Sequence, residues 1–393
     1  MSDRIRVLSV FGTRPEVIKL APLLLKMADQ PARFSSVVCS TGQHDRMLTQ
    51  ALRAFEISPD YNLDVMTIDQ KLSELTAKLL VGLEKVIAEV QPSVVLVQGD
   101  TTTTFSAALA AFYARVPVAH VEAGLRSWDS ANPFPEETNR VLTDRLASYY
   151  FAPTKSNRSN LLHEGVNTDR IFVTGNTAID ALMMMRAKVA DVDPHTWDGV
   201  WGSAGNVIAD KMQPLILVTA HRRESFGAPF RAICEALKEL ANDHPSWSFV
   251  YPVHLNPNVQ DVVNTTLGSV KNVHLIAPLD YDAFVYLMNR ALLILTDSGG
   301  IQEEAPSLQK PVIVMREKTE RTEAIDAGTA ILVGTQKENI KNAVEQLMGD
   351  RAFYESVRAR KNPYGDGLAS DRILDHLYGS LRPDMLELCG SVG

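Results

Sequence analysis

Carboxylate side chains follow short apolar runs in the first half of the chain, where buried strands are expected to end. Asp100 follows Gln98-Gly99 and Glu122 follows Val121, while the neighbouring Glu136 and Glu137 follow Pro135. Negative charges facing an anion-binding site weaken it, so their presence is costly unless chemistry uses them, and proton transfer is the natural use. Two alternatives stay open. In the first alternative, one of the two glutamates lies at a solvated helix start. In the second, Asp100 caps a helix expected over 101–111.

Residues suited to anion binding also follow expected strands, in both halves. Gly12-Thr13-Arg14 is followed by Lys19 in the first half, while the second half has His221-Arg222-Arg223 and Ser298-Gly299-Gly300. Free backbone N–H groups at a helix start and nearby cations would bind a diphosphate. The alternatives are a tight turn for the two glycines and a hydrogen-bonded core histidine for His221.

The elements that must position these residues are short aliphatic runs alternating with longer helix-like segments. Continuous rather than alternating apolarity predicts parallel strands buried on both faces, and hence an α/β fold with two Rossmann-like, doubly wound domains. In such sheets ligands bind beyond the carboxyl ends of the strands, so the turns are expected to converge on an interdomain cleft. The expected strands are Ile5 to Val10, Val37 to Cys39, Val94 to Val97, Val116 to Val121, Leu215 to Thr219, Phe249 to Val253, Leu292 to Leu295 and Val312 to Met315.

A boundary is expected between the halves at Asp191 to Asn206, which carries Trp197 and Trp201 without strand or helix periodicity and so suits a linker. We therefore predict an N-terminal domain over 1–190 that bears the carboxylates. A C-terminal domain over 207–350 would bind the nucleotide. The helix-like tail over 351–393 either caps the second domain or crosses back to the first.

Composition excludes several classes of protein. Of 393 residues, 45% are apolar and 22% charged, which is ordinary globular usage and argues against disorder or a coiled coil. The net charge of −8 argues against nucleic acid as the main partner. No apolar run suits a signal peptide or a membrane span. Three scattered cysteines fit neither a disulfide framework nor a cysteine zinc site, so we expect a reduced, cytoplasmic protein.

Ten segments together resemble the non-hydrolysing UDP-N-acetylglucosamine (UDP-GlcNAc) 2-epimerases, in family order from about residue 5 to 335. Ten segments in register make the resemblance highly specific. They are FGTRPEVIKLAPL, QGDTTTTFSAALAAFY, HVEAGLRS, PFPEETNR, TGNTAID, TAHRRESFG, PVHLNPNV, APLDYDAFVYLM, TDSGGIQEEAP and ERTEAIDAGTA.

The resemblance implies a fold like that of GT-B glycosyltransferases, with the C-terminal helices returning to the first domain. It also implies that UDP-GlcNAc and UDP-ManNAc are interconverted by inversion at C2, without a cofactor or a metal. The C2 proton lies beside no carbonyl, so a carboxylate alone cannot readily remove it at neutral pH. Loosening the bond from C1 to phosphate acidifies C2, and anti elimination then gives UDP and a glycal. Re-addition of UDP with protonation on the other face gives the epimer.

Site residues follow from the resemblance, position by position. Asp100 and Glu136 would transfer the C2 proton, Glu122 would orient or stabilise the C1 cation, and His221 would stabilise the departing diphosphate. Glu304 would bind the ribose hydroxyls, and Phe284 would stack on uracil, with helix core as its alternative because Phe284, Leu287 and Met288 have helical spacing. The full set of implied UDP-sugar ligands is Arg14, Lys19, Arg140, Phe284, Ser298, Gly299, Gly300, Glu304 and Arg321.

Many relatives in this family are activated by a second UDP-GlcNAc, and Gln43, Arg222 and His254 match positions associated with it. The chain departs from that pattern at two places. Arg46 stands where a glutamine is common, and Lys71 lies near the place of a common arginine. Either could contact phosphate, but lysine lacks the arginine fork, which leaves allosteric activation open. Thr322 also replaces a common proline after Glu320-Arg321, and we expect only a local effect.

Other functions remain as alternatives. A hydrolysing epimerase would share the fold and acids but release ManNAc and UDP, and a close variant would act on a modified UDP-HexNAc. A GT-B glycosyltransferase would need an acceptor groove and fewer strand-end acids, while a non-catalytic nucleotide-sugar sensor would not need the acids. The resemblance also implies a homodimer and a role in surface polysaccharide synthesis.

Overall fold

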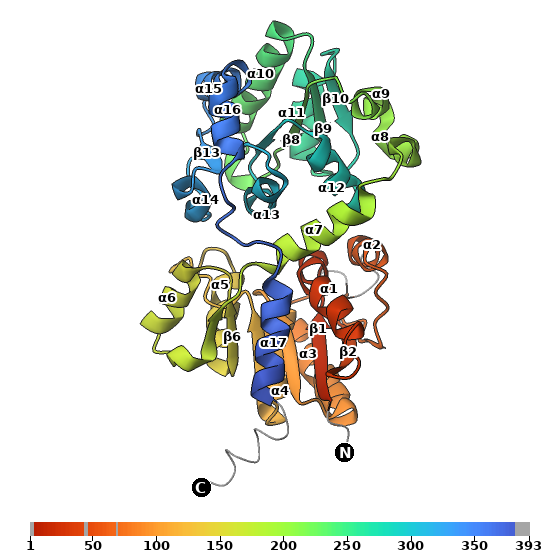
Figure 1. Ribbon diagram of the computed structural model, residues 1–393, viewed down its shortest axis with the longest axis vertical. Helices are drawn as coiled ribbons and strands as arrows, with labels where there is room; N and C mark the ends of the chain where they lie inside the picture. Colours follow the sequence, from red (N-terminus) through yellow and green to blue (C-terminus); the bar gives the residue numbers. More distant parts are fainter. Residues whose placement is uncertain (1–3, 43–45, 68–69, 382–393) are drawn as a thin grey trace. The chain divides into compact units, whose positions relative to one another are not determined.

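The computed structural model describes residues 4–42, 46–67 and 70–381, and its contacts divide the chain into two compact units. The first unit runs as far as Met183 and takes in the chain again from Gly365 onward. The second unit spans Met184–Tyr364. Each unit contains one parallel sheet with helices packed around it (Figure 1).

Within the described residues, the first unit has a seven-stranded parallel sheet in the order β3-β2-β1-β4-β5-β6-β7. Its strands β1, β4 and β5 have almost no exposed apolar side chain, because helices cover both of their faces. The strands are β1 Ile5–Phe11, β2 Phe34–Ser40, β3 Tyr61–Asn62, β4 Val94–Gln98, β5 Val118–Val121, β6 Tyr149–Ala152 and β7 Ile171–Val173. The helices are α1 Arg14–Ala28, α2 Arg46–Ala54, α3 Leu72–Val90, α4 Thr102–Tyr113, α5 Glu136–Leu146, α6 Lys155–His163, α7 Thr177–Val189, which continues into the second unit, and α17 Ala369–Leu381.

The second unit repeats this strand order with six described parallel strands, β10-β9-β8-β11-β12-β13. In both sheets the order reverses next to the first strand, between β1 and β4 and between β8 and β11, where open α/β sheets bind ligands. The strands are β8 Leu215–Thr219, β9 Ser248–Pro252, β10 Val273–Ile276, β11 Leu293–Thr296, β12 Val312–Val314 and β13 Ala330–Leu332. The helices are α8 Asp198–Trp201, α9 Gly205–Ala209, α10 Ala228–Asp243, α11 Pro257–Leu267, α12 Tyr281–Arg290, α13 Gly299–Glu304, α14 Thr322–Asp326, α15 Lys337–Gly349 and α16 Arg351–Arg358.

The predicted fold class is confirmed, and each of the eight expected strands is present with ends shifted by up to three residues. Sequence reasoning did not identify the short strands β3, β6, β7, β10 and β13. The segment over 191–206, predicted as a linker, forms short helical turns from Pro194 onward. Trp201 is fully buried there, and it and Trp197 pack against Tyr286 with ring centroids 6.3 and 5.1 Å away.

The described C-terminal helix α17 packs beside α1 in the first unit (Figure 1). One ion pair of 2.6 Å joins Lys26 of α1 to Asp371 of α17, and a second of 2.9 Å joins Arg33, which directly precedes β2, to Asp375 of α17. The start of α17 is also fixed, because the buried Asp180 carboxylate accepts hydrogen bonds from the first two backbone N–H groups of the helix. The preceding helix α16 belongs to the second unit. None of the described helices combines the length and apolarity needed to cross a bilayer.

Candidate active site

In the first unit, two turns meet where the strand order reverses. The first turn, Gly12-Thr13, joins β1 to α1, and the second, Gly99 to Thr101, joins β4 to α4. Gly12 is required by close approach, since a Cβ there would lie 2.5 Å from the Oγ1 atoms of both Thr41 and Thr103. The expected strand-to-helix turns therefore lie side by side at the carboxyl edge of the sheet.

Glu16, which sequence reasoning missed, lies in the first turn of α1 and links these two turns. Its Oε2 accepts hydrogen bonds from the backbone N–H groups of Gly12 at 3.0 Å and Thr13 at 2.7 Å. Its Oε1 accepts from the hydroxyls of Thr101 at 2.7 Å and Thr104 at 3.0 Å. Burial raises the pKa of Glu16, although the four donors oppose that rise. The signal that was available was the Thr-x-x-Glu spacing of a helix capping box.

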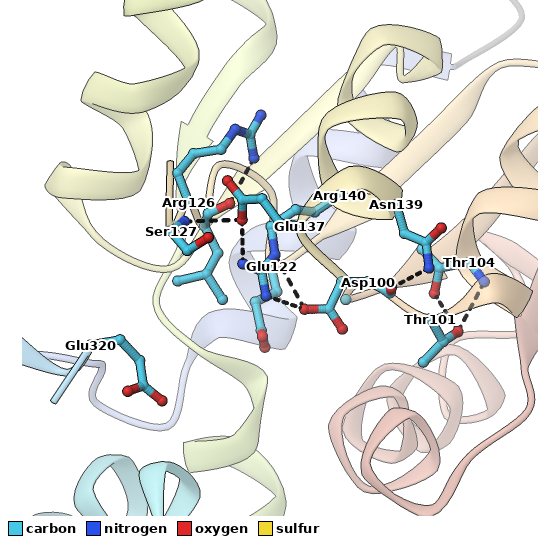
Figure 2. Close-up of polar contacts among 12 residues, drawn as sticks. Asp100, Thr101, Thr104, Glu122, Arg126, Ser127, Glu137, Asn139, Arg140 and Glu320 are labelled. Carbon is cyan, nitrogen blue, oxygen red and sulfur yellow. Dashed lines mark hydrogen bonds and ion pairs between the residues drawn. The ribbon is translucent and has the colours of Figure 1, made fainter. Parts of the chain in front are cut away.

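Asp100 lies in the turn between β4 and α4, where Arg140 of helix α5 holds its carboxylate (Figure 2). Arg140 Nη2 lies 2.5 Å and Nε 3.2 Å from Asp100 Oδ2, while Arg140 Nη1 donates to Glu137 Oε2 at 2.6 Å. The predicted alternative of Asp100 as a helix cap is wrong, because Thr101 Oγ1 accepts the capping hydrogen bond from the Thr104 N–H. The Asp100 carboxylate thus pairs with Arg140 instead of capping α4, and Asp100 also lines a cavity of the first unit.

Glu136 and Glu137 both lie in the first turn of α5 but face different surroundings. Glu136 and Asp100 line the same cavity of about 660 Å³, and Glu136 Oε2 is buried with no hydrogen-bond partner among the described residues. Glu137 is buried, and the expectation of a solvated helix start does not apply to it. Burial opposes its ionisation, but hydrogen bonds from Ser127 N–H, Arg140 and Trp128 N–H outweigh burial and lower its pKa.

Glu122 follows β5 with a backbone in the left-handed region, at φ +71°. Its Oε2 forms an ion pair with Lys19 and accepts a hydrogen bond from Gln98 Nε2 at 3.0 Å. Both charged side chains are largely buried, with 11% of Glu122 and 17% of Lys19 exposed. Lys19, predicted as a substrate ligand, therefore lies against a predicted catalytic acid, while Arg14 is the first residue of α1.

In the second unit, the turns after β8 and β11 are joined by Asp297. Its fully buried carboxylate accepts, through Oδ2, hydrogen bonds of 2.7 Å from the backbone N–H groups of both His221 and Arg222. Its Oδ1 has no hydrogen-bond partner among the described residues and lies 3.8 Å from His221 Nδ1. Sequence reasoning assigned no role to Asp297, although it directly precedes the predicted Ser298-Gly299-Gly300 turn.

His221 is not the core histidine of the alternative interpretation, since 42% of its side chain is exposed. Its ring stacks on that of His254, with centroids 5.0 Å apart and planes 10° apart. Partial burial lowers the pKa of His221, and the charges of His254 and Arg222 add to this effect while that of Asp297 opposes it. His221 is therefore predominantly neutral at pH 7 unless a bound anion changes the balance.

The remaining predicted ligands of the second unit lie on or near α13 and α12. Arg321 lies against the predicted turn, because a Cβ on Gly299 would be 3.3 Å from its guanidinium carbon. Arg321 also forms an ion pair of 2.7 Å with Glu303, next to the predicted ribose ligand Glu304. Phe284 on α12 is half-buried, whereas Leu287 and Met288 on the same helix are fully buried.

The predicted second-nucleotide residues are only partly within the described chain. Gln43 lies outside the described residues, and Arg46 is described only through its backbone as the first residue of α2. Lys71 is exposed at the start of α3 in the first unit. Arg222 and His254 lie beside His221 in the second unit, and Arg222 forms a 3.5 Å ion pair with Glu320.

Known proteins match this chain over most of its length. Residues 26–378 match the family model described as UDP-N-acetylglucosamine 2-epimerase. A UDP-N-acetylglucosamine 2-epimerase of Yersinia pestis is 56% identical over 372 residues, covering 95% of this chain and 98% of that protein.

Two solved structures are also similar along nearly their whole length. The UDP-GlcNAc 2-epimerase of Neisseria meningitidis bound to UDP-GlcNAc is 47% identical, with a TM-score of 0.86 and coverage of 95% of this chain and 100% of that one. The Methanocaldococcus jannaschii enzyme in complex with UDP-GlcNAc and UDP is 35% identical, with a TM-score of 0.76 and coverage of 95% and 99%. The protein is thus an enzyme of the class with two Rossmann-like units and acids at the strand ends. The chain belongs to the UDP-N-acetylglucosamine 2-epimerase family.

Proposed function

We propose that this enzyme interconverts UDP-GlcNAc and UDP-ManNAc by inverting C2, without releasing free sugar. The observation that carries the proposal is the pair Asp100 and Glu136 on one cavity, in a chain of this family. Two carboxyl groups are the minimum for removing a proton from one face of C2 and returning one to the other. The buried Glu136 Oε2, with no hydrogen-bond partner in the described chain, suits the acceptance of a proton.

In the proposed reaction the bond between C1 and the phosphate oxygen breaks, and its electrons leave with UDP. Asp100 or Glu136 takes the C2 proton, and the electrons of that C–H bond form the C1=C2 double bond of a 2-acetamidoglucal. The other carboxyl group then protonates C2 on the opposite face while UDP adds back to C1. Glu122, held by Lys19 and Gln98, is suited by its carboxyl group to stabilise positive charge at C1.

We assign UDP binding chiefly to the second unit. His221 and the Ser298-Gly299-Gly300 turn are suited to the diphosphate, because Asp297 links the backbone of one turn to the start of the other. Retaining UDP matters, since loss of UDP would turn the epimerase into a source of free glycal. The half-buried Phe284 offers an aromatic face for uracil, and Glu304 a carboxylate for the ribose hydroxyls.

The test is proton NMR of the purified protein with UDP-GlcNAc in deuterated water. We expect UDP-ManNAc to appear with deuterium at C2 and no steady accumulation of free sugar. Accumulation of ManNAc and UDP would instead assign a hydrolysing epimerase. Absence of exchange at high UDP-GlcNAc would contradict the proposal and direct the search to a modified UDP-HexNAc, to glycosyl transfer or to nucleotide-sugar sensing.

We also propose that the enzyme is a cytoplasmic homodimer that supplies a precursor of surface polysaccharide. A reducing compartment agrees with the buried free thiols of Cys39 and Cys234. Burial raises the pKa of both thiols to about 12, so neither is a reactive thiolate near neutral pH. Light scattering of the full chain tests the oligomeric state, and a monomer at micromolar concentration would contradict the dimer.

A further inference from the structure

His120, in strand β5, has a fully buried side chain whose two ring nitrogens both face oxygen acceptors. Nδ1 lies 2.6 Å from Asp144 Oδ1, and Nε2 lies 2.7 Å from the carbonyl oxygen of Gly99. A neutral imidazole has one N–H group and can donate to only one acceptor. If Asp144 is ionised, both contacts are hydrogen bonds only when the ring carries a hydrogen on each nitrogen.

The surroundings of Asp144 favour its ionised form. Burial opposes ionisation of Asp144, whereas the charge and hydrogen bond of Arg126 act, independently of His120, to lower its pKa. Asp144 Oδ2 accepts from Arg126 Nη2 at 2.7 Å and from the Gly124 N–H at 3.1 Å. The other ionisable groups at this cluster are Glu164, paired with Arg126 at 2.6 Å, and Tyr150, whose hydroxyl donates to the backbone oxygen of Asp144.

The two ends of this contact chain reach the turns that carry predicted catalytic acids. Gly99 directly precedes Asp100, and Gly124 lies two residues after Glu122. Gly99, Glu122 and Gly124 all have positive φ, so both turns depart from regular structure at these points. Only 0% of the His120 side chain and 1% of the Asp144 side chain are exposed, which excludes contact of either with a substrate.

We propose that His120 and Asp144 form a positioning pair, a buried imidazolium and carboxylate that fix the Asp100 turn relative to the Glu122 turn. The proposal rests on the proposed function, because fixed acids matter for proton transfer at C2. A misplacement of about 1 Å at a reacting centre lowers a rate by about 100-fold. The pair therefore acts through Asp100 and Glu122 rather than on the sugar.

The first part of the test measures the ring itself in the full-length wild-type enzyme. Nitrogen-15 NMR of histidine-labelled protein, assigned with His120→Gln, should show both His120 ring nitrogens bearing hydrogen near neutral pH. A single protonated nitrogen would overturn the imidazolium. This measurement does not depend on catalysis. It needs one stable variant for the assignment, and His120→Asn can serve if His120→Gln does not fold.

The second part separates the two arms of the pair. His120→Asn retains an amide donor near the Nδ1 position, toward Asp144, whereas His120→Gln retains one near the Nε2 position, toward Gly99. We expect each to lower kcat for C2 exchange by about 10- to 100-fold with KM changed less than about threefold. In carbon-13 spectra, His120→Asn should shift the Asp100 carboxyl signal most and His120→Gln the Glu122 signal.

Tyr150→Phe is the matched control, because it removes a buried hydroxyl that donates to the backbone of Asp144 and Ala147 but contacts neither turn. We expect it to lower the melting temperature while leaving kcat within about twofold. If the His120 variants also lose only stability, the pair is structural and the proposal is wrong. If wild-type enzyme exchanges no C2 proton, the proposed function fails, and the ring and carboxyl signals still decide the positioning pair.

Discussion

The turns at the reversal point of the first sheet are held differently from those of the second, although the two sheets share one strand order. In the first unit, Glu16 joins the turns after β1 and β4, and His120 with Asp144 joins the turns after β4 and β5. In the second unit, Asp297 joins the turns after β8 and β11 through two backbone N–H groups. Side-chain exposure differs accordingly, at 11% for Glu122 and 42% for His221.

This difference matches the chemistry proposed for each unit. Proton transfer depends on fixed distances between acids and the reacting carbon, which a buried hydrogen-bond network provides. Binding of a charged diphosphate tolerates adjustment, because the anion itself orders exposed cations on arrival. We therefore expect damage in the first unit to lower kcat and damage in the second unit to weaken nucleotide binding.

Glu136→Gln should have the largest effect. It preserves side-chain shape but removes the proton acceptor at the cavity, so we expect kcat for C2 exchange to fall by about 10²- to 10⁴-fold. The free energy of unfolding should change by less than about 0.5 kcal/mol, since Glu136 Oε2 has no hydrogen-bond partner among the described residues. Deuterium exchange by NMR and urea unfolding measure the two quantities.

The neighbouring Glu137→Gln is the contrast for that variant. Glu137 accepts two backbone hydrogen bonds and pairs with the buried Arg140, so its charge is structural. We expect a loss of about 1–3 kcal/mol in unfolding free energy and a smaller fall in kcat. The opposite result, with Glu136→Gln unstable but active, would break the division of roles between these adjacent acids.

Asp297→Ala should have the next largest effect, on binding. It leaves the N–H groups of His221 and Arg222 without their acceptor, so the phosphate-facing turn loses its shape. We expect the Kd for UDP, measured by calorimetry, to rise by about 10- to 100-fold, or about 1.4–2.7 kcal/mol. Asp243→Ala, which removes a surface partner of Lys341, is the control. Unchanged UDP affinity in Asp297→Ala would show that UDP binding by the second unit does not depend on this turn.

The sequence predicted the strand-end acids and cations because each follows an apolar run that is readable without tertiary context. Asp100, Glu122, His221 and Ser298 all lie at such positions in the structure. Short strands such as β7 were missed, because three residues carry too little periodicity. The short helical turns near Trp201 were not predicted, because the burial of Trp201 depends on Tyr286, 85 positions further along the chain.

The connecting residues were missed for a different physical reason. Glu16, His120 and Asp297 act through hydrogen bonds to backbone atoms of other turns, and a sequence does not show which turns are neighbours. His120 lies inside a buried strand, where a histidine reads as an interruption of an apolar run. Only the pairing of β4 with β5 places its ring beside Gly99.

Glu16 allows a finer test of the network in the first unit. Glu16→Ala removes an acceptor for four donors, and we expect a loss of about 1–2 kcal/mol in unfolding free energy. Glu16→Gln should be milder, because its amide oxygen can accept from the Gly12 and Thr13 N–H groups while the threonine hydroxyls rotate to accept from its NH₂. Urea unfolding of both variants measures the difference. Equal losses would mean that the charge, rather than the connectivity, stabilises the turns.

His254→Ala should have the smallest effect on basal turnover. It removes the ring stacked on His221, an interaction of about 0.5–1 kcal/mol, so we expect kcat to change less than about threefold. If a second UDP-GlcNAc activates the enzyme through this region, the wild-type rate should rise sigmoidally with UDP-GlcNAc, and His254→Ala should be hyperbolic. Lys71→Ala, in the first unit, tests the other predicted contact in the same assay. A hyperbolic wild type would exclude such activation, and a loss of kcat as large as that of Glu136→Gln would instead make His254 part of the catalytic site.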